Sequence, residues 1–321
     1  MYFGSIKFFK HVIICIICLC VLIPTILSVA FSVQNQKLVA KNAEITERFQ
    51  NQGIALQQAE TALLEKQQGQ SQMLAPAGES AESVPEKDPS AAREPSFDYQ
   101  AFYPELYCEA SASFVKKDKT LYLTFDDGPS DLTEKILDIL DEQEVKATFF
   151  VVGKDSEQGR ENLRKIVERG HEVGIHTYSH NYRKIYASVN SFLEDFYEEY
   201  QWVYETCGVK ATIYRFPGGS INAYNQLIYK EIIAEMARRG FTYYDWNLSG
   251  EDAVKGSTAQ KVKDNLLNRM DGVDRGIILL HDGHSQTVEV LGEVISALKK
   301  DGYTFEPLTN EVEPITFPYI D

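Results

Sequence analysis

Between residues 121 and 306, short apolar strand patterns alternate with amphipathic helical patterns, and this alternation constrains the fold more than any other feature. The expected strands are 121–125, 147–152, 172–175, 211–214, 241–245, 276–280 and 303–306, and the expected helices are 133–142, 161–169, 192–207, 225–239, 258–270 and 288–300. Repeated β/α units are typical of α/β proteins with a parallel sheet. The sequence therefore predicts an α/β fold, a distorted (β/α) barrel of about seven units, and a doubly wound open sheet is the alternative.

The N-terminal segment predicts a membrane anchor. Residues 11–33 contain no Asp, Glu, Lys or Arg and are long enough to span a bilayer as one helix. Lys7 and Lys10 precede this run, which favours a cytoplasmic N-terminus and a C-terminal bulk outside the cell. Residues 1–33 are thus expected to form a single-pass signal-anchor in the cell membrane. Residues 28–30 (Ser-Val-Ala) resemble a signal-peptide cleavage site, so secretion after cleavage is the alternative.

Two segments without chemistry of their own follow the anchor. Residues 34–68 are rich in Gln, Ala and Glu and carry apolar residues at near-heptad spacing. They predict a helical stalk, either one solvated helix or a coiled coil that permits a homodimer. Residues 69–96 collect Pro, Ala, Ser, Glu and Gly without periodicity, which predicts a disordered linker. Together these two segments would hold the domain expected at 97–321 at a distance from the membrane.

The charge balance of the chain limits the classes of molecule that it is expected to bind. The chain has 32 Lys and Arg against 47 Asp and Glu, a net charge of −15, which argues against nucleic-acid binding. Most of the excess acidity lies in the C-terminal domain, which suits a neutral glycan better than a polyanion. Cys108 and Cys207 are the cysteines outside the apolar N-terminal run. One bridge between them and two reduced thiols are both open.

Polar residues follow the expected strands where a barrel places its active site, at the carboxyl ends of the strands. These residues are Asp126 and Asp127 after 121–125, His176 after 172–175 with His180 four residues on, Arg215 after 211–214, Asp245 and Trp246 at the end of 241–245, and His281 and Asp282 after 276–280. We therefore expect one polar site at this end of the sheet.

The spacing within this set points to a metal. On one helical turn, His176 and His180 would face the same way, as a divalent ion requires. The adjacent carboxylates of Asp126 and Asp127 could divide the work, one turned to the metal and the other to a water molecule. Two histidines and one carboxylate fit catalytic zinc, and they also fit iron(II) or another divalent ion.

Five motifs in a fixed order carry a family resemblance. They are TFDDGPS at 124–130, HTYSH at 176–180, RFPGG at 215–219, DW at 245–246 and LLHD at 279–282. Together they resemble the successive motifs of the polysaccharide deacetylases, carbohydrate esterase family 4, over residues 120–307. The resemblance implies a distorted (β/α) barrel and a hydrolase that removes acetyl groups from polysaccharides. It also implies one divalent metal ion, usually zinc, with cobalt, nickel, manganese and iron(II) as alternatives.

The resemblance also assigns roles around the metal. Asp127, His176 and His180 would hold the ion. Asp126 would be the general base that takes a proton from the attacking water, and it must stay unprotonated to do so. Arg215 would pair with Asp126 and keep it ionised and oriented.

The remaining roles concern the leaving group and the substrate. His281 would be the general acid that protonates the leaving amine, and Asp245 would tune His281 directly or through neighbours. A backbone N–H near Gly218 would help to stabilise the oxyanion. Trp246 and Leu279 would line the pocket for the acetyl methyl group or the sugar face.

The chain departs from the family pattern at two positions. Gly218 and Gly219 stand where the family often has an aromatic residue and then glycine, so a wall of the groove is expected to be missing. Ile175 precedes His176 where asparagine is common, so a supporting hydrogen bond is expected to differ. Both departures bear on substrate preference more than on activity.

An exported, tethered domain of this family could reach the cell wall, so peptidoglycan N-acetylglucosamine is the first expected substrate. Chitin oligosaccharides, an exopolysaccharide and acetylated xylan are the alternatives. Two other classes of function stay open. One is a non-catalytic member that binds glycan, and the other is a different metal hydrolase or an iron(II) oxygenase.

Overall fold

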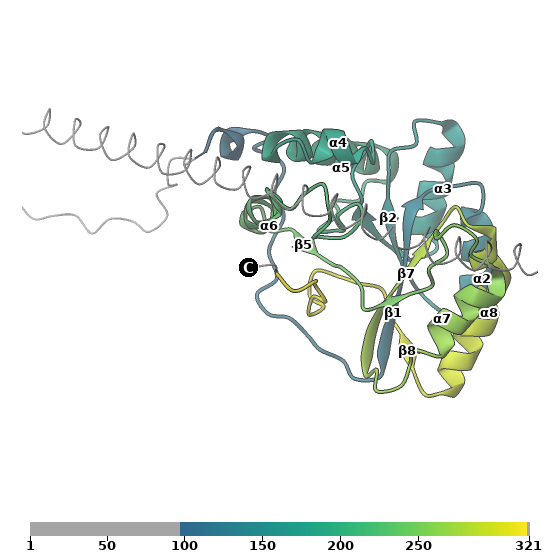
Figure 1. Ribbon diagram of the computed structural model, residues 1–321. Helices are drawn as coiled ribbons and strands as arrows, with labels where there is room; N and C mark the ends of the chain where they lie inside the picture. The colour runs from purple at the N-terminus through teal and green to yellow at the C-terminus, as the bar shows by residue number, and fades with distance from the viewer. Residues whose placement is uncertain (1–96, 320–321) are drawn as a thin grey trace, which may run out of the picture. The chain divides into compact units, whose positions relative to one another are not determined.

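The computed structural model describes residues 97–319, which form a parallel sheet with helices packed along its outside (Figure 1). The transmembrane helix predicted within 1–33, the stalk at 34–68 and the linker at 69–96 lie outside the described residues. Within the described range, no helix has both the length and the apolar character needed to cross a membrane.

The elements follow the predicted alternation of strand and helix. The strands are β1 (Thr120–Gly128), β2 (Thr148–Val151), β3 (Glu172–Ile175), β4 (Ile213–Tyr214), β5 (Thr242–Tyr243), β6 (Leu248–Ser249), β7 (Arg275–His281) and β8 (Thr304–Phe305). The helices are the 3₁₀-helix η1 (Asp98–Ala101) and the α-helices α2 (Thr133–Glu142), α3 (Glu157–Glu168), α4 (Tyr182–Ile185), α5 (Val189–Cys207), α6 (Tyr229–Arg238), α7 (Ala259–Leu267) and α8 (Ser285–Lys300).

The sheet has the strand order of an opened barrel. The order is β5-β4-β3-β2-β1-β7-β6, and β8 pairs with the first residues of β1. Every pairing is parallel, and within 97–319 no pairing joins β5 to β6. The helices contact one another in the order α7, α8, α2, α3, α5, α6, which follows the strands and makes one outer layer. The predicted parallel α/β fold is confirmed, and this arrangement is that of a distorted (β/α) barrel rather than of a doubly wound sheet.

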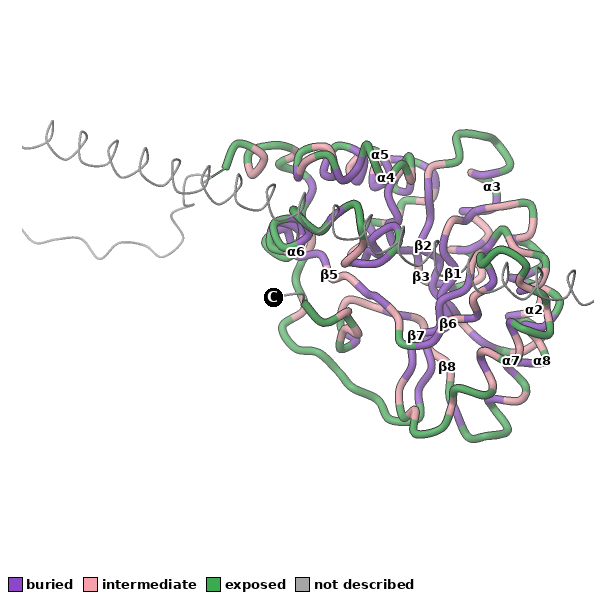
Figure 2. Tube along the Cα trace, in the orientation of Figure 1, coloured by how far each residue is buried: buried purple, intermediate pink, exposed green. Residues whose placement is uncertain are grey.

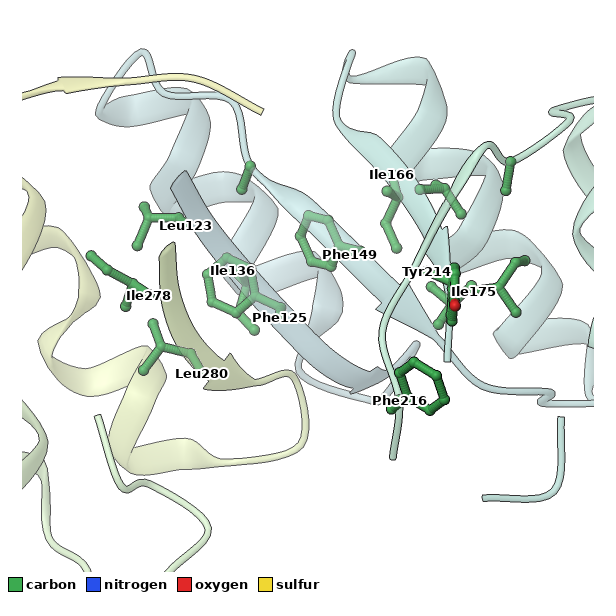
Figure 3. Packing of buried hydrophobic residues seen from close by; sticks show 14 of the residues in the cluster. Leu123, Phe125, Ile136, Phe149, Ile166, Ile175, Tyr214, Phe216, Ile278 and Leu280 are labelled. Atoms are coloured by element: carbon green, nitrogen blue, oxygen red, sulfur yellow. The ribbon is translucent and has the colours of Figure 1, made fainter. Parts of the chain in front are cut away.

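Side-chain alternation divides the core into two parts. In β1, Leu121, Leu123 and Phe125 face the helices, and Phe125 stacks on Phe149 of β2 with ring centres 5.1 Å apart (Figure 3). Tyr122 faces the barrel interior. A second cluster fills this interior with Tyr122, Phe150, Ile213, Tyr244, Ile277, Leu308 and Val312. Leu308 and Val312 belong to the C-terminal segment, which therefore closes the inner side of the opened barrel.

Burial follows this division along the chain (Figure 2). Most strand residues are buried, and the helices bury the side turned to the sheet. Fully burying a large apolar side chain contributes about 1.5–3 kcal/mol. The two rows of strand side chains thus hold the sheet to the helices on one face and to the C-terminal segment on the other.

Some local details go beyond the predicted elements or differ from them. β6 and α4 are too short to show a period and are not predicted. The helix predicted at 225–239 corresponds to α6 and begins at Tyr229 rather than at Asn225, because the Asn225 side chain bonds the preceding turn instead, accepting from Asn222 N–H at 2.8 Å. Cys108 and Cys207 are free thiols, which decides between the two open alternatives.

Candidate metal and catalytic site

The last inward-facing residues of several strands meet at the carboxyl end of the sheet. Side chains alternate between the faces of a strand, so the inward row of Tyr122 continues through Thr124 to Asp126. By the same alternation, Arg215 is the next inward position beyond β4. His281 is the direct β7 partner of Asp126 across the ladder. The structure therefore brings together polar residues that are far apart in the sequence.

A β-bulge turns two consecutive carboxylates toward one place. The pairing of β1 with β2 shifts its register between Asp126 and Gly128, so Asp127 is the extra residue. Its φ of 66° lies in the left-handed region, which Asp adopts more readily than most residues. A regular strand would send the two side chains to opposite faces. Here Asp126 Oδ2 lies 3.7 Å and Asp127 Oδ1 3.6 Å from His176 Nε2.

Asp127, His176 and His180 form a compact set of metal donors. Asp127 Oδ1 lies 3.2 Å from His180 Nε2, and one donor atom from each residue lies within 4.8 Å of the others. His176 is buried, whereas Asp127 and His180 are half-buried. Two histidine nitrogens and one carboxylate oxygen, open on one side, are a typical donor set for a catalytic divalent ion.

The protonation of these residues fits a cation between them. His176 Nδ1 lies 2.8 Å from the Arg215 carbonyl oxygen, which can only accept, so Nδ1 carries the proton. Burial lowers the pKa of His176 to about 3, which keeps the ring neutral and leaves a lone pair on Nε2. Asp127 Oδ1 is buried and has no hydrogen-bond partner within the described part of the chain. Two acceptors that face each other without a proton are unfavourable unless a cation lies between them.

The two histidines lie on a loop between β3 and α4, so the predicted helical turn is wrong. Thr177 has a φ of 69° and His180 a φ of 49°, and these left-handed conformations interrupt any helix. A positive φ is uncommon for a β-branched residue such as threonine. Strain of this kind persists where surrounding contacts hold it.

Asp195 of α5 supplies such contacts. It is fully buried, and its Oδ1 accepts hydrogen bonds from the backbone N–H groups of Tyr178 at 2.8 Å and Ser179 at 2.9 Å. Its Oδ2 pairs with Lys184 Nζ at 3.0 Å. Asp195 therefore positions the segment that joins the two histidines. Sequence reasoning missed it because it occupies the core face of a helix outside every motif.

Arg215 lies buried against Asp126 and fixes its carboxylate. Arg215 Nη1 donates to Asp126 Oδ1 at 2.8 Å and to Thr124 Oγ1 at 2.6 Å, and Nε donates to the Tyr244 carbonyl oxygen at 2.9 Å. The predicted pairing of Arg215 with Asp126 is confirmed. Burial raises the pKa of Asp126, and the positive charge of Arg215 opposes this rise. The guanidinium thus favours the ionised carboxylate in the absence of bulk water.

His281 is held by Asp252. His281 Nδ1 lies 2.8 Å from Asp252 Oδ1, and the His281 backbone N–H donates to Asp252 Oδ2 at 2.7 Å. Thr287 Oγ1 also donates to this oxygen, at 2.6 Å. Burial alone would lower the pKa of His281, but Asp252 and Asp126 raise it to about 9. The ring is therefore protonated at neutral pH, with Nδ1–H on Asp252 and Nε2–H left for the site.

Asp245 makes no direct contact with His281 in the described residues, so the direct form of their predicted partnership is wrong. Asp245 instead accepts hydrogen bonds from the Ser220 N–H and from the Phe317 N–H, each at 2.8 Å. The reason is topological, because Asp245 follows the edge strand β5 whereas His281 ends β7 near the opposite edge. Asp245 ties the C-terminal segment to the turn after β4.

Asp252 could have been found from the sequence by one further step. It lies three residues after β6, a strand of two residues that shows no alternation. Examining the polar residues that follow this strand would have marked Asp252 alongside the others.

The three residues predicted to bind substrate lie around this site. Gly218 is exposed in the turn after β4, and its N–H has no acceptor within the described part of the chain. Trp246 is half-buried and packs edge-on against Phe317, with ring centres 4.9 Å apart. Leu279 is buried at the inward position before His281. Their binding roles stay predictions.

Comparisons with known proteins agree with this geometry. The profile of the polysaccharide deacetylase family matches residues 115–239. The YheN protein of Bacillus subtilis is 32% identical over 204 residues, which are 62% of this chain and 70% of YheN. A peptidoglycan-N-acetylglucosamine deacetylase of Bacillus cereus is 31% identical over 192 residues, 59% of this chain and 85% of that protein.

A solved structure has the same fold. It is the catalytic domain of a peptidoglycan N-acetylglucosamine deacetylase from Eubacterium rectale, with a TM-score of 0.62 and 34% sequence identity. The similarity covers 66% of this chain and 98% of that domain.

Proposed function

The chain belongs to the polysaccharide deacetylase family, and on this premise we propose that it hydrolyses N-acetyl groups of peptidoglycan N-acetylglucosamine with the help of a divalent metal. The observation that carries the proposal is the convergence of two sets of residues. The metal donors Asp127, His176 and His180 lie beside the carboxylate of Asp126, which Arg215 holds. A protonated imidazole, His281, follows on the neighbouring strand.

Each residue has a defined task in this proposal. When bound, the ion supplies a Lewis acid for the acetyl carbonyl and for the attacking water. Asp126, whose ionised form Arg215 favours, accepts the proton of that water. The Gly218 N–H donates to the carbonyl oxygen as negative charge develops on it. His281 gives its Nε2 proton to the leaving nitrogen while Nδ1–H stays on Asp252, so the C–N bond breaks and acetate and a free amine result.

The choice of glycan rests on the relatives and on the N-terminal sequence. Two of the similar proteins are named for peptidoglycan N-acetylglucosamine. The apolar residues 11–33 support a domain that works outside the cell, either tethered or released. Chitin oligosaccharides, exopolysaccharide and acetylated xylan are the substrates to rank against it.

Removal of the metal is expected to abolish acetate release. The full chain is treated with a chelator, dialysed, and offered purified peptidoglycan and N-acetylchitooligosaccharides. Activity should fall to the background rate and return when zinc is added, because Asp126 and His281 alone do not polarise the amide. Cobalt, nickel and manganese added in parallel rank the ions.

The same experiment can overturn the proposal. Full acetate release by protein shown to be metal-free would exclude the metal role. Metal binding without acetate release from any glycan would favour a glycan-binding protein instead.

Replacement of Asp195 is expected to weaken metal binding. Asp195→Ala removes the acceptor for the Tyr178 and Ser179 N–H groups, so the loop between the histidines loses its fixed shape. Loss of such a supporting contact typically costs about 10–100-fold in metal affinity. Competition with a chromogenic chelator measures the affinity for zinc, and circular dichroism checks that the domain is folded.

Lys184→Met is the matched control, because it removes the ion pair with Asp195 Oδ2 and leaves the two backbone contacts on Oδ1. Its zinc affinity should fall much less than that of Asp195→Ala, because the acceptor for the Tyr178 and Ser179 N–H groups remains. An Asp195→Ala protein with unchanged zinc affinity would show that Asp195 does not position the site.

A further inference from the structure

Asp282 directly follows His281 and has no role in the proposed chemistry. Its side chain is fully buried. Ser130 Oγ donates to Asp282 Oδ1 at 2.8 Å, and Thr133 Oγ1 donates to Asp282 Oδ2 at 2.7 Å. Both donors belong to the turn between β1 and α2. A buried carboxylate with a protein donor on each oxygen is suited to hold the shape of this turn rather than to contact a substrate.

The same two hydroxyl groups also hold the backbone of the turn. The Ser130 N–H donates to Thr133 Oγ1 at 2.8 Å, and the Leu132 N–H donates to Ser130 Oγ at 3.0 Å. Because each hydroxyl oxygen accepts from a backbone N–H, its own proton is left for Asp282. Asn162 of α3 adds a further contact, since its Nδ2 donates to the Ser130 carbonyl oxygen at 2.8 Å. The turn is thereby fixed to the end of β7 and to α3.

Asp282 also lies directly against the β-bulge that carries Asp127. A Cβ at Gly128 would lie 2.3 Å from Asp282 Oδ2, so a side chain at this position would displace the carboxylate. The Asp282 N–H donates to the Asp126 carbonyl oxygen at 2.9 Å. Asp282 therefore contacts the residue before Asp127 through its backbone and the residue after it through its side chain.

Asp127 depends on such contacts because its backbone conformation is uncommon. Its φ is 66°, and strain of this kind persists only where surrounding contacts hold it. We propose that Asp282 is a positioning residue for the metal centre. It holds the β-bulge so that the Asp127 carboxylate meets His176 and His180. This inference rests on the proposed function and adds to it the residue that sets the direction of one metal ligand.

Asp282→Asn is expected to weaken zinc binding about 10–100-fold, as is typical when a contact that orients a metal ligand is lost. An amide has one acceptor oxygen, so either Ser130 Oγ or Thr133 Oγ1 would face an NH₂ group and the turn would shift. Competition with a chromogenic chelator measures the zinc affinity of the full chain. The absorption spectrum of the cobalt-loaded chain should change as well, because it depends on the geometry of the ligands.

Thr133→Val and Thr133→Ser form a matched pair. Valine keeps the shape of threonine but leaves Asp282 Oδ2 and the Ser130 N–H without their partner, whereas serine keeps the hydroxyl group. Thr133→Val should weaken zinc binding in the same direction as Asp282→Asn, and Thr133→Ser should restore most of the affinity. An equal loss in both variants would contradict the inference, because it would show that packing alone matters at this position.

Gly128→Ala is an independent variant, because it displaces the Asp282 carboxylate without removing a hydrogen-bonding group. It should also weaken zinc binding and change the cobalt spectrum. A role of Asp282 in stability alone would lower the melting temperature of these variants and leave both readouts of the folded protein unchanged.

The inference and the proposed function fail in different measurements. Folded Asp282→Asn and Gly128→Ala proteins with the zinc affinity and cobalt spectrum of the unmodified chain would overturn the inference. If circular dichroism shows that Asp282→Asn does not fold, the comparison of Thr133→Val with Thr133→Ser decides it. An unmodified chain that binds zinc but releases no acetate from any glycan would overturn the proposed function, and the zinc affinities would still decide whether Asp282 positions the metal centre.

Discussion

Replacing Asp126 with asparagine is expected to lower kcat for acetate release about 10³-fold while the metal stays bound. The amide has nearly the same shape as the carboxylate and can still accept a hydrogen bond from Arg215 Nη1. It cannot take a proton from the attacking water, so the loss falls on the chemical step. Acetate release by the full chain, together with metal content measured on the same sample, tests this expectation.

Asp127→Asn is the matched partner variant, because the two carboxylates are adjacent and the β-bulge gives them different directions. It should lose metal affinity, and added zinc at high concentration should restore part of its activity. Asp126→Asn should not respond to added zinc. Equal behaviour of the two variants would contradict the separation of base and ligand, and an active Asp126→Asn protein would overturn the assignment of the base.

Replacing Asp252 with asparagine is expected to lower kcat/KM about 10²–10⁴-fold. Asp252 accepts from His281 Nδ1, from the His281 N–H and from Thr287 Oγ1. An amide offers one oxygen, so either His281 Nδ1 or the other two donors would face an NH₂ group. The His281 ring then loses both its orientation and the charge that keeps it protonated.

The pH profile separates this effect from a general loss of structure. Asp252 raises the pKa of His281, so removing its charge lowers that pKa. Activity that needs protonated His281 is lost as the pH rises through this pKa, so the alkaline limb of the kcat/KM profile should move to lower pH in Asp252→Asn. Asp245→Asn is the control, since Asp245 has no contact with His281 in the described structure, and its alkaline limb should stay in place. A common shift in both variants would contradict the role of Asp252.

Local patterns in the sequence predict most of the elements and much of the site. The helix predicted at 133–142 and the strand predicted at 172–175 are confirmed with the same bounds. The alternation through β1 also determines that Asp126 faces the interior with Tyr122. Strand-end reasoning thereby located the residues that the structure brings together, and the family resemblance implied the pairing of Asp126 with Arg215.

Expectations based on spacing alone were less secure. The i, i+4 interval of His176 and His180 indicated a helical turn, yet the two rings converge from a loop with left-handed backbone at Thr177. The interval shows only that the two histidines are near each other in the sequence. The shape of the segment depends on Asp195, which a local pattern does not connect to it.

The sequence by itself determined the alternation of most strands and helices along the chain, the position of Asp126, Arg215 and His281 at the carboxyl ends of strands, and the family. Only the tertiary structure decided that Asp252 rather than Asp245 holds His281, and that the Tyr182 ring lies against Gly218. The physical reason is the range of the interactions. A periodic pattern relates residues that are neighbours in the sequence, whereas these contacts join separate segments. The approach of those segments depends on the order of strands in the opened barrel and on the paths of its loops.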